Sequence, residues 1–226
     1  MTPPTPAPYN TGMSRLMQRL VPAAGLLVAV LATVVAVRAW RGELALAEGR
    51  AAQRRGDLNA AAAAYRVASG RGNADAAVER SRLEMLRRDW SAANGSLREA
   101  MALAPARAWP HVLQAQLEME IPGPWDDARD ERILGSCRIA VALEPYRSRT
   151  RRECAAITHR LAARRRTIWN PARTQAVLAT AEREVRTVVE KNVKDTKAWF
   201  LLGEILRDSG RDGEAAAAFR AAGRKP

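Results

Sequence analysis

One spacing recurs along the chain and restricts what it can fold into. In its clearest copy, Gly210 is followed five and nine residues later by Ala215 and Phe219. Two other places repeat this order of turn residue, small residue and large residue: Gly56, Ala61 and Tyr65, and Arg88, Ala93 and Leu97. Apolar residues lie at helical spacing on both sides of each turn, so each copy predicts two short helices folded back on each other.

The fullest copy begins at Trp199 and reads W-x2-L-G-x2-L, then Gly, then A-x3-F-x2-A. Its residues are Trp199, Leu202, Gly203, Leu206, Gly210, Ala215, Phe219 and Ala222. This pattern resembles the tetratricopeptide repeat (TPR), a helix–turn–helix unit of about 34 residues. The resemblance implies an all-α fold in which helix pairs stack into an α-solenoid and each pair covers the apolar face of its neighbour.

Five helical pairs are expected between residues 42 and 226. Their predicted ranges are 42–73, 74–105, 106–145, 146–195 and 196–226. Gly49 takes the place of Gly203 in the first pair, and Trp109 takes the place of Trp199 in the third. The third pair carries an insertion, EIPGPWDDARDE, and the fourth is degenerate, with an unusually long first helix.

A second stretch, LVPAAGLLVAVLATVVAV, holds 18 uncharged residues between Arg19 and Arg38. With Ala39 and Trp40 it reaches the roughly 20 residues that a membrane-spanning helix needs. We therefore expect a transmembrane helix over residues 20–40, after a disordered Pro-rich tail over residues 1–19. A cleaved signal peptide is the alternative, although the better cleavage site, Ala45-Leu46-Ala47, falls inside the first repeat helix.

The flanks of this helix bear on its orientation. The tail carries Arg15 and Arg19 with no acid, but the far side begins with Arg38 and Arg41 and is at least as basic. Charges in a short flexible flank count for more than charges in a folded domain, so we expect the N-terminus inside and the repeats outside. The Arg-rich and Ala-rich composition is typical of a GC-rich bacterial genome, which makes the inner membrane and the periplasm the expected location.

Small residues recur every four positions inside the predicted membrane helix, at Gly25, Ala29 and Thr33. Such a stripe lets a second membrane helix approach closely. An Ala-rich chain also produces such stripes by chance, so both interpretations stay open.

The two cysteines, Cys137 and Cys154, are 17 residues apart and flank the Pro145-Tyr146 turn. On helices that pack antiparallel, a disulfide between them is geometrically conceivable, and an oxidising periplasm would allow it. The alternative is that Cys137 is the small core residue that its repeat position requires, with Cys154 packed nearby.

No catalytic motif is found in the sequence, and neither an enzyme nor a cofactor is expected. The chain lacks the GxxxxGKS/T, HExxH and GxSxG patterns, and its only histidines are His111 and His159. An acidic cluster in the insertion is interpreted as the first turn of a helix, with a metal site as the alternative. Its residues are Asp126, Asp127, Asp130 and Glu131.

The resemblance also implies where a protein partner binds. In this family the first helix of each pair lines a concave groove that holds peptides or partner helices. Carried over by position, the groove residues are Arg50, Gln53, Arg54, Arg82, Met85 and Gln114. They would suit an extended or helical segment with acidic character.

A basic segment stands apart, with nine arginines and a single acid between Pro145 and Arg173. Its predicted patch comprises Arg147, Arg149, Arg151, Arg152, Arg160, Arg164, Arg165 and Arg166. A patch of this kind could meet anionic lipid or an acidic protein, and the alternative is a solvated helix face. Nucleic acid is disfavoured because no aromatic residues are interleaved for base stacking.

Together these features predict an all-α, single-pass membrane protein whose repeats hold partner proteins, integral membrane proteins among them, at the bacterial inner membrane. The expected role is to assist assembly, secretion or biogenesis of an envelope complex. The alternatives are a soluble or secreted adaptor with a cleaved signal, and an accessory subunit of a membrane enzyme such as a polysaccharide ligase or polymerase.

Overall fold

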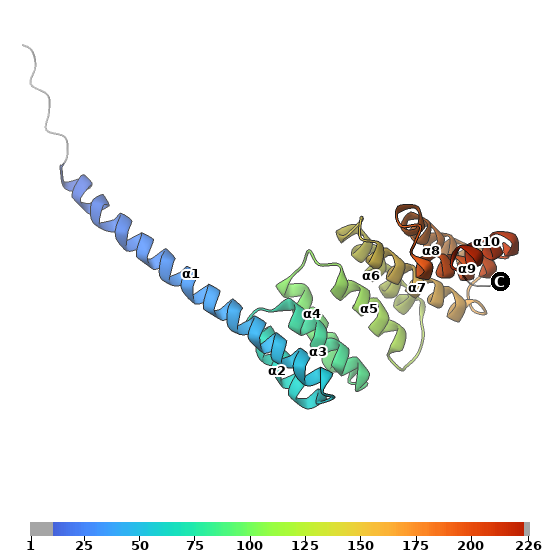
Figure 1. The fold of residues 1–226 in the computed structure, drawn as a ribbon, viewed down its shortest axis with the longest axis horizontal. Coiled ribbons are helices and arrows are strands. Elements are labelled where there is room, and N and C mark those ends of the chain that lie inside the picture. The colour runs from blue at the N-terminus through green and yellow to red at the C-terminus, as the bar shows by residue number, and fades with distance from the viewer. Residues whose placement is uncertain (1–10, 224–226) are drawn as a thin grey trace, which may run out of the picture.

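The computed structural model describes residues 11–223, with side chains from residue 24 onward, and this part of the chain is helical without strands. Figure 1 shows a long N-terminal helix that projects from a curved stack of shorter helices. The helices are α1 (Thr11–Arg54), α2 (Leu58–Gly70), α3 (Ala74–Leu86), α4 (Trp90–Leu103), α5 (Trp109–Glu120), α6 (Asp127–Leu143), α7 (Ser148–Arg165), α8 (Pro171–Lys191), α9 (Thr196–Asp208) and α10 (Asp212–Ala221).

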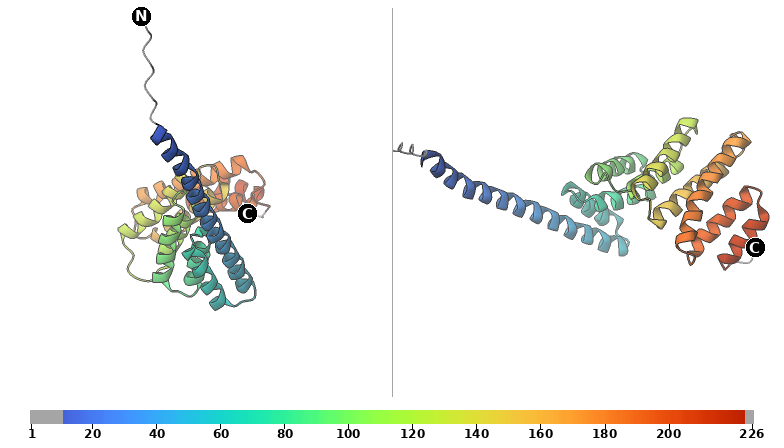
Figure 2. Two further views of the ribbon diagram at one scale, coloured as in Figure 1. Left: turned by 90° about the vertical axis from the view of Figure 1, so that its left-hand side faces the viewer. Right: turned by 90° about the horizontal axis from the view of Figure 1, so that it is seen from above.

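Consecutive helices pack as five hairpins, and the hairpins stack in chain order (Figures 1 and 2). The pairs are α1 with α2, α3 with α4, α5 with α6, α7 with α8, and α9 with α10. The predicted all-α solenoid is therefore confirmed. Each hairpin lies within one of the five predicted ranges, except that α1 extends far beyond the first.

The turns explain why the recurring spacing produces hairpins. Gly56 and Gly210 have positive φ angles of 81° and 78°, and Arg88 at the same place in the second pair has 59°. This left-handed backbone ends one helix. In the first and second pairs an aspartate, Asp57 or Asp89, then caps the next helix, whereas in the fifth pair Arg211 takes that place without a side-chain cap. After Arg88, for example, Asp89 accepts a hydrogen bond from the Ala92 N–H at 3.1 Å.

Small residues in the first helices admit aromatic rings from the second helices. A Cβ built on Gly203 would lie 2.6 Å from Cε1 of Phe219, and one on Gly49 would lie 2.4 Å from Cε1 of Tyr65. Both distances are far below a normal carbon–carbon contact, so only glycine permits this approach. The predicted equivalence of Gly49 and Gly203 thus has a packing cause.

Helix α1 is one uninterrupted helix of 44 residues and shows no break near residue 40. Residues 1–10 of the expected tail lie outside the described residues, whereas 11–19 belong to α1, so the prediction of a tail as far as residue 19 is wrong. Gly42, just after the apolar run, does not end the helix and faces Arg71 at the turn between α2 and α3. Contacts with the solenoid begin at Arg38, whose Nη2 donates to the Gly70 carbonyl at 2.9 Å.

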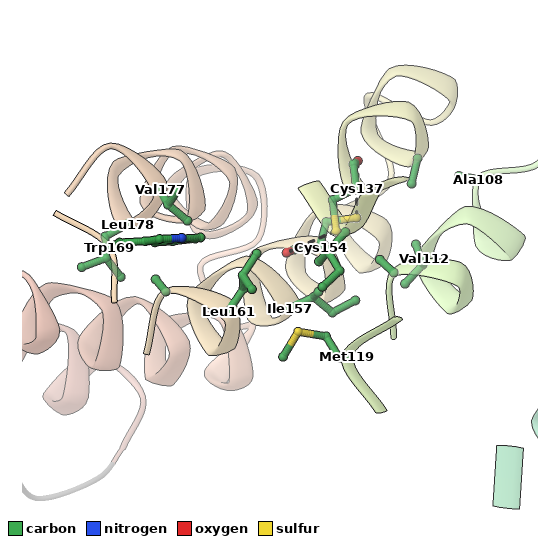
Figure 3. Close-up of a cluster of buried hydrophobic side chains, with 14 residues drawn as sticks. Ala108, Val112, Met119, Cys137, Cys154, Ile157, Leu161, Trp169, Val177 and Leu178 are labelled. Atoms are coloured by element: carbon green, nitrogen blue, oxygen red, sulfur yellow. Dashed lines mark hydrogen bonds between the residues drawn. The ribbon is translucent and has the colours of Figure 1, made fainter. Parts of the chain in front are cut away.

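The third and fourth hairpins share one core (Figure 3). Its labelled members are Ala108, Val112, Met119, Cys137, Cys154, Ile157, Leu161, Trp169, Val177 and Leu178. After the first hairpin, which includes the 44-residue α1, the fourth is the longest, with 18 residues in α7 and 21 in α8. Both of its helices are long, whereas the sequence suggested a long first helix only.

Candidate partner-binding groove

Two adjoining hollows, of about 650 and 450 Å³, open where the first helices of four hairpins face one another. Most of their lining comes from α1, α3, α5 and α7, which places them on the inner face of the curved stack. The two hollows share Glu79, Arg82, Trp109 and Arg149. We call the combined surface the inner groove.

Trp109 lies at the centre of the inner groove, between two arginines from neighbouring helices. The guanidinium carbon of Arg149 is 4.2 Å from the centroid of the indole ring, and that of Arg82 is 5.4 Å from it. Each such cation–π contact contributes about 0.5–2 kcal/mol, depending on how far it is removed from water. The indole thus joins α3, α5 and α7 and holds two cations in the groove.

The groove combines an apolar floor with arginines of two kinds and with five acidic residues, Asp75, Glu79, Glu120, Glu144 and Glu153. Apolar lining is supplied by Met85, Leu86, Trp90, Val112, Leu113 and Ile157. Arg82 forms an ion pair with Glu79 at 3.0 Å, and Arg147 forms one with Glu144 at 3.1 Å. In contrast, Arg50, Arg149 and Arg160 have no ion pair with any residue of the described chain.

The sequence matches no protein-family model and no curated protein. Solved structures do match. MamA from Desulfovibrio magneticus RS-1 is 12% identical with a TM-score of 0.58, and the match covers 80% of this chain and 93% of that one. PilW, described as a widely conserved type IV pilus biogenesis factor, is 15% identical with a TM-score of 0.61, covering 80% and 76%.

YrrB, described as a TPR protein with an unusual peptide-binding site, is 12% identical with a TM-score of 0.53, covering 79% of this chain and 82% of its own. This chain has the tetratricopeptide-repeat fold. At such identities the likeness concerns the fold alone, and the chemistry of a TPR groove depends on the side chains that line it.

Four of the six predicted groove residues line the TPR inner groove: Arg50, Gln53, Arg82 and Met85. Arg54 and Gln114 do not. The Gln114 amide instead lies 3.5 Å from Glu118, which forms an ion pair with Arg132 of α6. Gln116, two residues further along α5, lines the groove in its place. Each residue turns a helix by about 100°, so a small error in register moves a side chain to another face.

The basic segment divides into two groups of arginines. Arg147, Arg149 and Arg160 line the TPR inner groove, so part of the predicted patch belongs to the predicted groove. The other five bind within the protein. Arg151 pairs with Glu184, Arg152 with Asp195, and Arg165 with Asp130, while Arg164 donates to the Met119 carbonyl and Arg166 to the Asp208 carbonyl.

The insertion in the third TPR unit is held by a buried carboxylate, Asp130, which the sequence analysis placed in an acidic first turn without predicting its burial. Asp130 is fully buried and accepts hydrogen bonds from the indole N–H groups of Trp125 at 2.6 Å and Trp169 at 3.0 Å. Nε of Arg165 lies 2.9 Å from its second oxygen. This cluster of Asp130, Trp125, Trp169 and Arg165, which we call the Asp130 network, joins α6 to the start of α8.

A second buried cation supports the same insertion. Arg129 is 4% exposed, and its guanidinium donates to the backbone carbonyls of Glu118 and Ile121 and stacks 4.1 Å from the Trp125 ring. Burial lowers the pKa of Arg129, because a cation away from water loses hydration. Carboxylates of the insertion therefore act as helix caps and structural ion pairs. Within the described residues, no three His, Cys, Asp or Glu side chains are placed to hold a metal ion.

Proposed function

We propose that this chain is a membrane-anchored TPR scaffold that holds an acidic segment of a partner protein in its inner groove at the bacterial inner membrane. The observation that carries this proposal is the convergence of Arg50, Arg149 and Arg160 on one groove without acidic partners of their own. A segment that supplies carboxylates to these arginines and apolar side chains to the floor satisfies both parts of the surface.

The long helix supports the anchor. Between Ala24 and Arg54 the mean hydropathy of the best window is 1.7 and none of that window is buried. Leu26, Val28 and Val35 are 65–68% exposed, and an apolar helix face of this extent is typical of lipid contact. A signal sequence has the same length and hydropathy, so the choice between the two depends on the part of α1 beyond the apolar run.

The continuity of α1 favours an uncleaved anchor over a signal peptide. The better cleavage site includes Ala45 and Leu46, which are 3% and 2% exposed in the core of the first hairpin. Cleavage there would remove most of the helix that pairs with α2. The same continuity fixes the groove relative to the membrane, because Arg50 lies on α1 about 20 Å beyond the end of the apolar run at 1.5 Å per residue.

We further propose that the repeats face the periplasm and that the chain assists assembly or biogenesis of an envelope complex. The likeness to PilW, a pilus biogenesis factor, and to YrrB, a peptide-binding TPR protein, supports this role by analogy of fold. Protease added to spheroplasts should digest the repeats. Protection of the repeats in sealed spheroplasts would reverse the orientation.

The anchor is tested by extraction. Detergent should release the full chain from membranes, whereas high salt and carbonate should not, since neither removes a spanning helix. A chain that begins at Arg38, where contacts with the solenoid start, should be soluble without detergent. Release of the full chain by salt would contradict the anchor.

The groove is tested by photo-crosslinking in cells. A benzophenone amino acid at Gln116 should capture the partner, while the same group at Asn94 on α4, outside the groove, should not. Replacing Arg50, Arg149 and Arg160 by Glu should abolish the Gln116 adduct. The matched control replaces three exposed arginines of second helices, Arg66, Arg98 and Arg220, and should leave the adduct intact.

The control variant should keep nearly the same melting temperature, because exposed substitutions usually change stability by no more than about 0.5 kcal/mol each. The groove variant should also lose the Arg149–Trp109 contact, which contributes about 0.5–2 kcal/mol, and should still fold. Equal loss of the adduct in both variants would mean that net charge, and not the groove, holds the partner. An adduct that survives the groove substitutions would assign binding to another surface.

A further inference from the structure

The only two cysteines of the chain meet near the turn that joins α6 of the third TPR unit to α7 of the fourth. The Cys154 thiol donates to the Cys137 carbonyl at 3.6 Å, and the Cys137 thiol donates to the Cys154 carbonyl at 3.9 Å. Figure 3 shows both side chains pointing toward one another inside the core shared by the third and fourth TPR units. Reciprocal contacts of this kind require the two helix backbones to be close at this level.

The environment of the two thiols is apolar, so it suits a disulfide better than two separate thiol groups. Cys137 is 5% and Cys154 is 1% exposed, and both are free thiols in the structure. They also line one side of a recess of about 500 Å³ between α6, α7 and α8, with Leu134, Val141 and Val177 among its apolar walls. A disulfide needs no hydrogen-bond partner in such an apolar core.

We propose that Cys137 and Cys154 form a disulfide that fastens α6 to α7 when the chain folds in an oxidising compartment. This site does not depend on the inner groove, since the recess lies between α6, α7 and α8 and shares no lining residue with either hollow. In the cell the disulfide needs an oxidant, and only for that oxidant does this proposal rest on the proposed location. The test uses the purified chain with an added oxidant, so it does not depend on that location.

The reaction is thiol–disulfide exchange with a disulfide oxidant such as oxidised glutathione. One cysteine, as its thiolate, attacks a sulfur of the oxidant and expels one glutathione thiolate. The second cysteine attacks the resulting mixed disulfide and expels the other. Two electrons pass to the oxidant, and the two protons from the cysteines are taken up by the two glutathione molecules.

The surroundings of the two thiols in the folded chain determine at which stage of folding the disulfide forms. A side-chain hydrogen bond with Cys137, followed by burial, raises the pKa of Cys154 far above its ordinary value. Because the thiolate is the reactive form, the buried pair of thiols reacts slowly in disulfide exchange once α6 and α7 are packed together. The bond therefore forms while α6 and α7 come together, and the finished core shields it from reductants. These properties are those of a structural staple, not of a redox switch.

The test refolds the reduced full-length chain in detergent with a mixture of reduced and oxidised glutathione. Alkylation of the denatured product, followed by peptide mass spectrometry, should find Cys137 linked to Cys154 in one copy and neither thiol alkylated. A link that closes a loop of this length should raise the melting temperature by roughly 5 °C over the chain refolded with reduced glutathione alone.

Two free thiols after oxidative refolding, or a link between two copies, would overturn the proposal. An intramolecular link with no rise in melting temperature would overturn the stapling role. The control replaces both cysteines by alanine, and its melting temperature should be equal in the two buffers. Because the mass measurement needs only the natural chain, the result stands even if the double variant folds poorly, and none of these outcomes affects the anchor or the groove.

Discussion

The first and second TPR units are joined differently from the third and fourth. The core beneath α1, α2 and α3 is made largely of alanine, with Leu46, Tyr65 and Leu83 as its large members. Between the third and fourth units, a buried aspartate, an arginine and two tryptophans form the Asp130 network. The same stacking of helix hairpins thus relies on small residues and closely approaching backbones in one place, and on an apolar core reinforced by buried polar contacts in the other.

The two junctions therefore differ in how strongly their stability depends on any single residue. An alanine interface spreads its burial over many small contacts, so no one side chain dominates. The Asp130 network concentrates its stability in one carboxylate, because two indole N–H groups donate to it and the buried Arg165 guanidinium forms an ion pair with it, and such groups are costly to leave unpaired.

The largest expected effect comes from Asp130→Ala. Removing the carboxylate leaves the buried Trp169 indole N–H and the partly buried Trp125 indole N–H without their acceptor. The buried Arg165 guanidinium then keeps only the exposed Asp127 as an ionic partner, so the total cost should be about 3–5 kcal/mol. The melting temperature should fall by about 10 °C. Asp127→Ala is the control, since its side chain is 72% exposed and its pairs with Arg165 and Arg173 should contribute no more than about 1 kcal/mol. Equal losses of melting temperature in the two variants would show that the buried network contributes no more stability than the exposed ion pairs.

The alanine-rich junctions were predictable from the sequence for a physical reason. Close approach of two helices needs small residues at fixed intervals, and such intervals lie within one hairpin of about 34 residues. Gly56, Arg88 and Gly210 mark the turns, and the glycines at 49 and 203 face the predicted aromatic rings. These features predicted the first, second and fifth hairpins from local spacing, whereas the third pair carries an insertion and the fourth is degenerate.

The Asp130 network was not predictable in this way, because its members are far apart in the chain. Asp130 and Trp169 are separated by 39 residues, and the stretch around Asp130 looks like any acidic first turn of a helix. The basic segment was misjudged for the same reason. The sequence shows the arginines together, but Glu184 and Asp195, which pair with Arg151 and Arg152, come from later elements.

For the inner groove, some features could be predicted from the sequence and others could not. Of the residues expected from the family resemblance, Arg50, Gln53, Arg82 and Met85 line the inner groove, since the first-helix positions are set by the repeat. It could not show that Arg149 of the fourth unit stacks on Trp109 of the third, because that contact depends on how successive units are rotated. The continuity of α1 was also missed, since an apolar run and a repeat helix were treated as two separate elements.

An intermediate effect is expected from Gly203→Ala, which tests the close-approach type of packing. The added methyl group would lie 2.6 Å from Cε1 of Phe219, and the overpacking should cost about 1–3 kcal/mol in urea unfolding. Gly95→Ala is the matched control on α4, because no atom lies within 4 Å of the added carbon. That variant should gain about 0.5–1 kcal/mol from helix propensity. A stabilising Gly203→Ala would mean that Phe219 moves aside and that the small residue is not required.

The smallest expected effect concerns Arg88, where the alanine-rich half departs from its own pattern. Arg88 has a φ of 59° at a turn position that glycine occupies in the first and fifth units. A side chain in this left-handed conformation costs about 1–2 kcal/mol, and glycine loses about 0.5–1 kcal/mol of chain entropy on folding. Arg88→Gly should therefore raise stability by roughly 0.5 kcal/mol, which thermal unfolding would show as an increase in melting temperature of about 1–2 °C.

Gly56→Ala should shift the melting temperature the opposite way, because alanine at a φ of 81° acquires the strain that Arg88 already bears. If Arg88→Gly instead lowers the melting temperature, the Arg88 side chain contributes more to the fold than its backbone costs, and this junction depends on a single residue as the Asp130 network does.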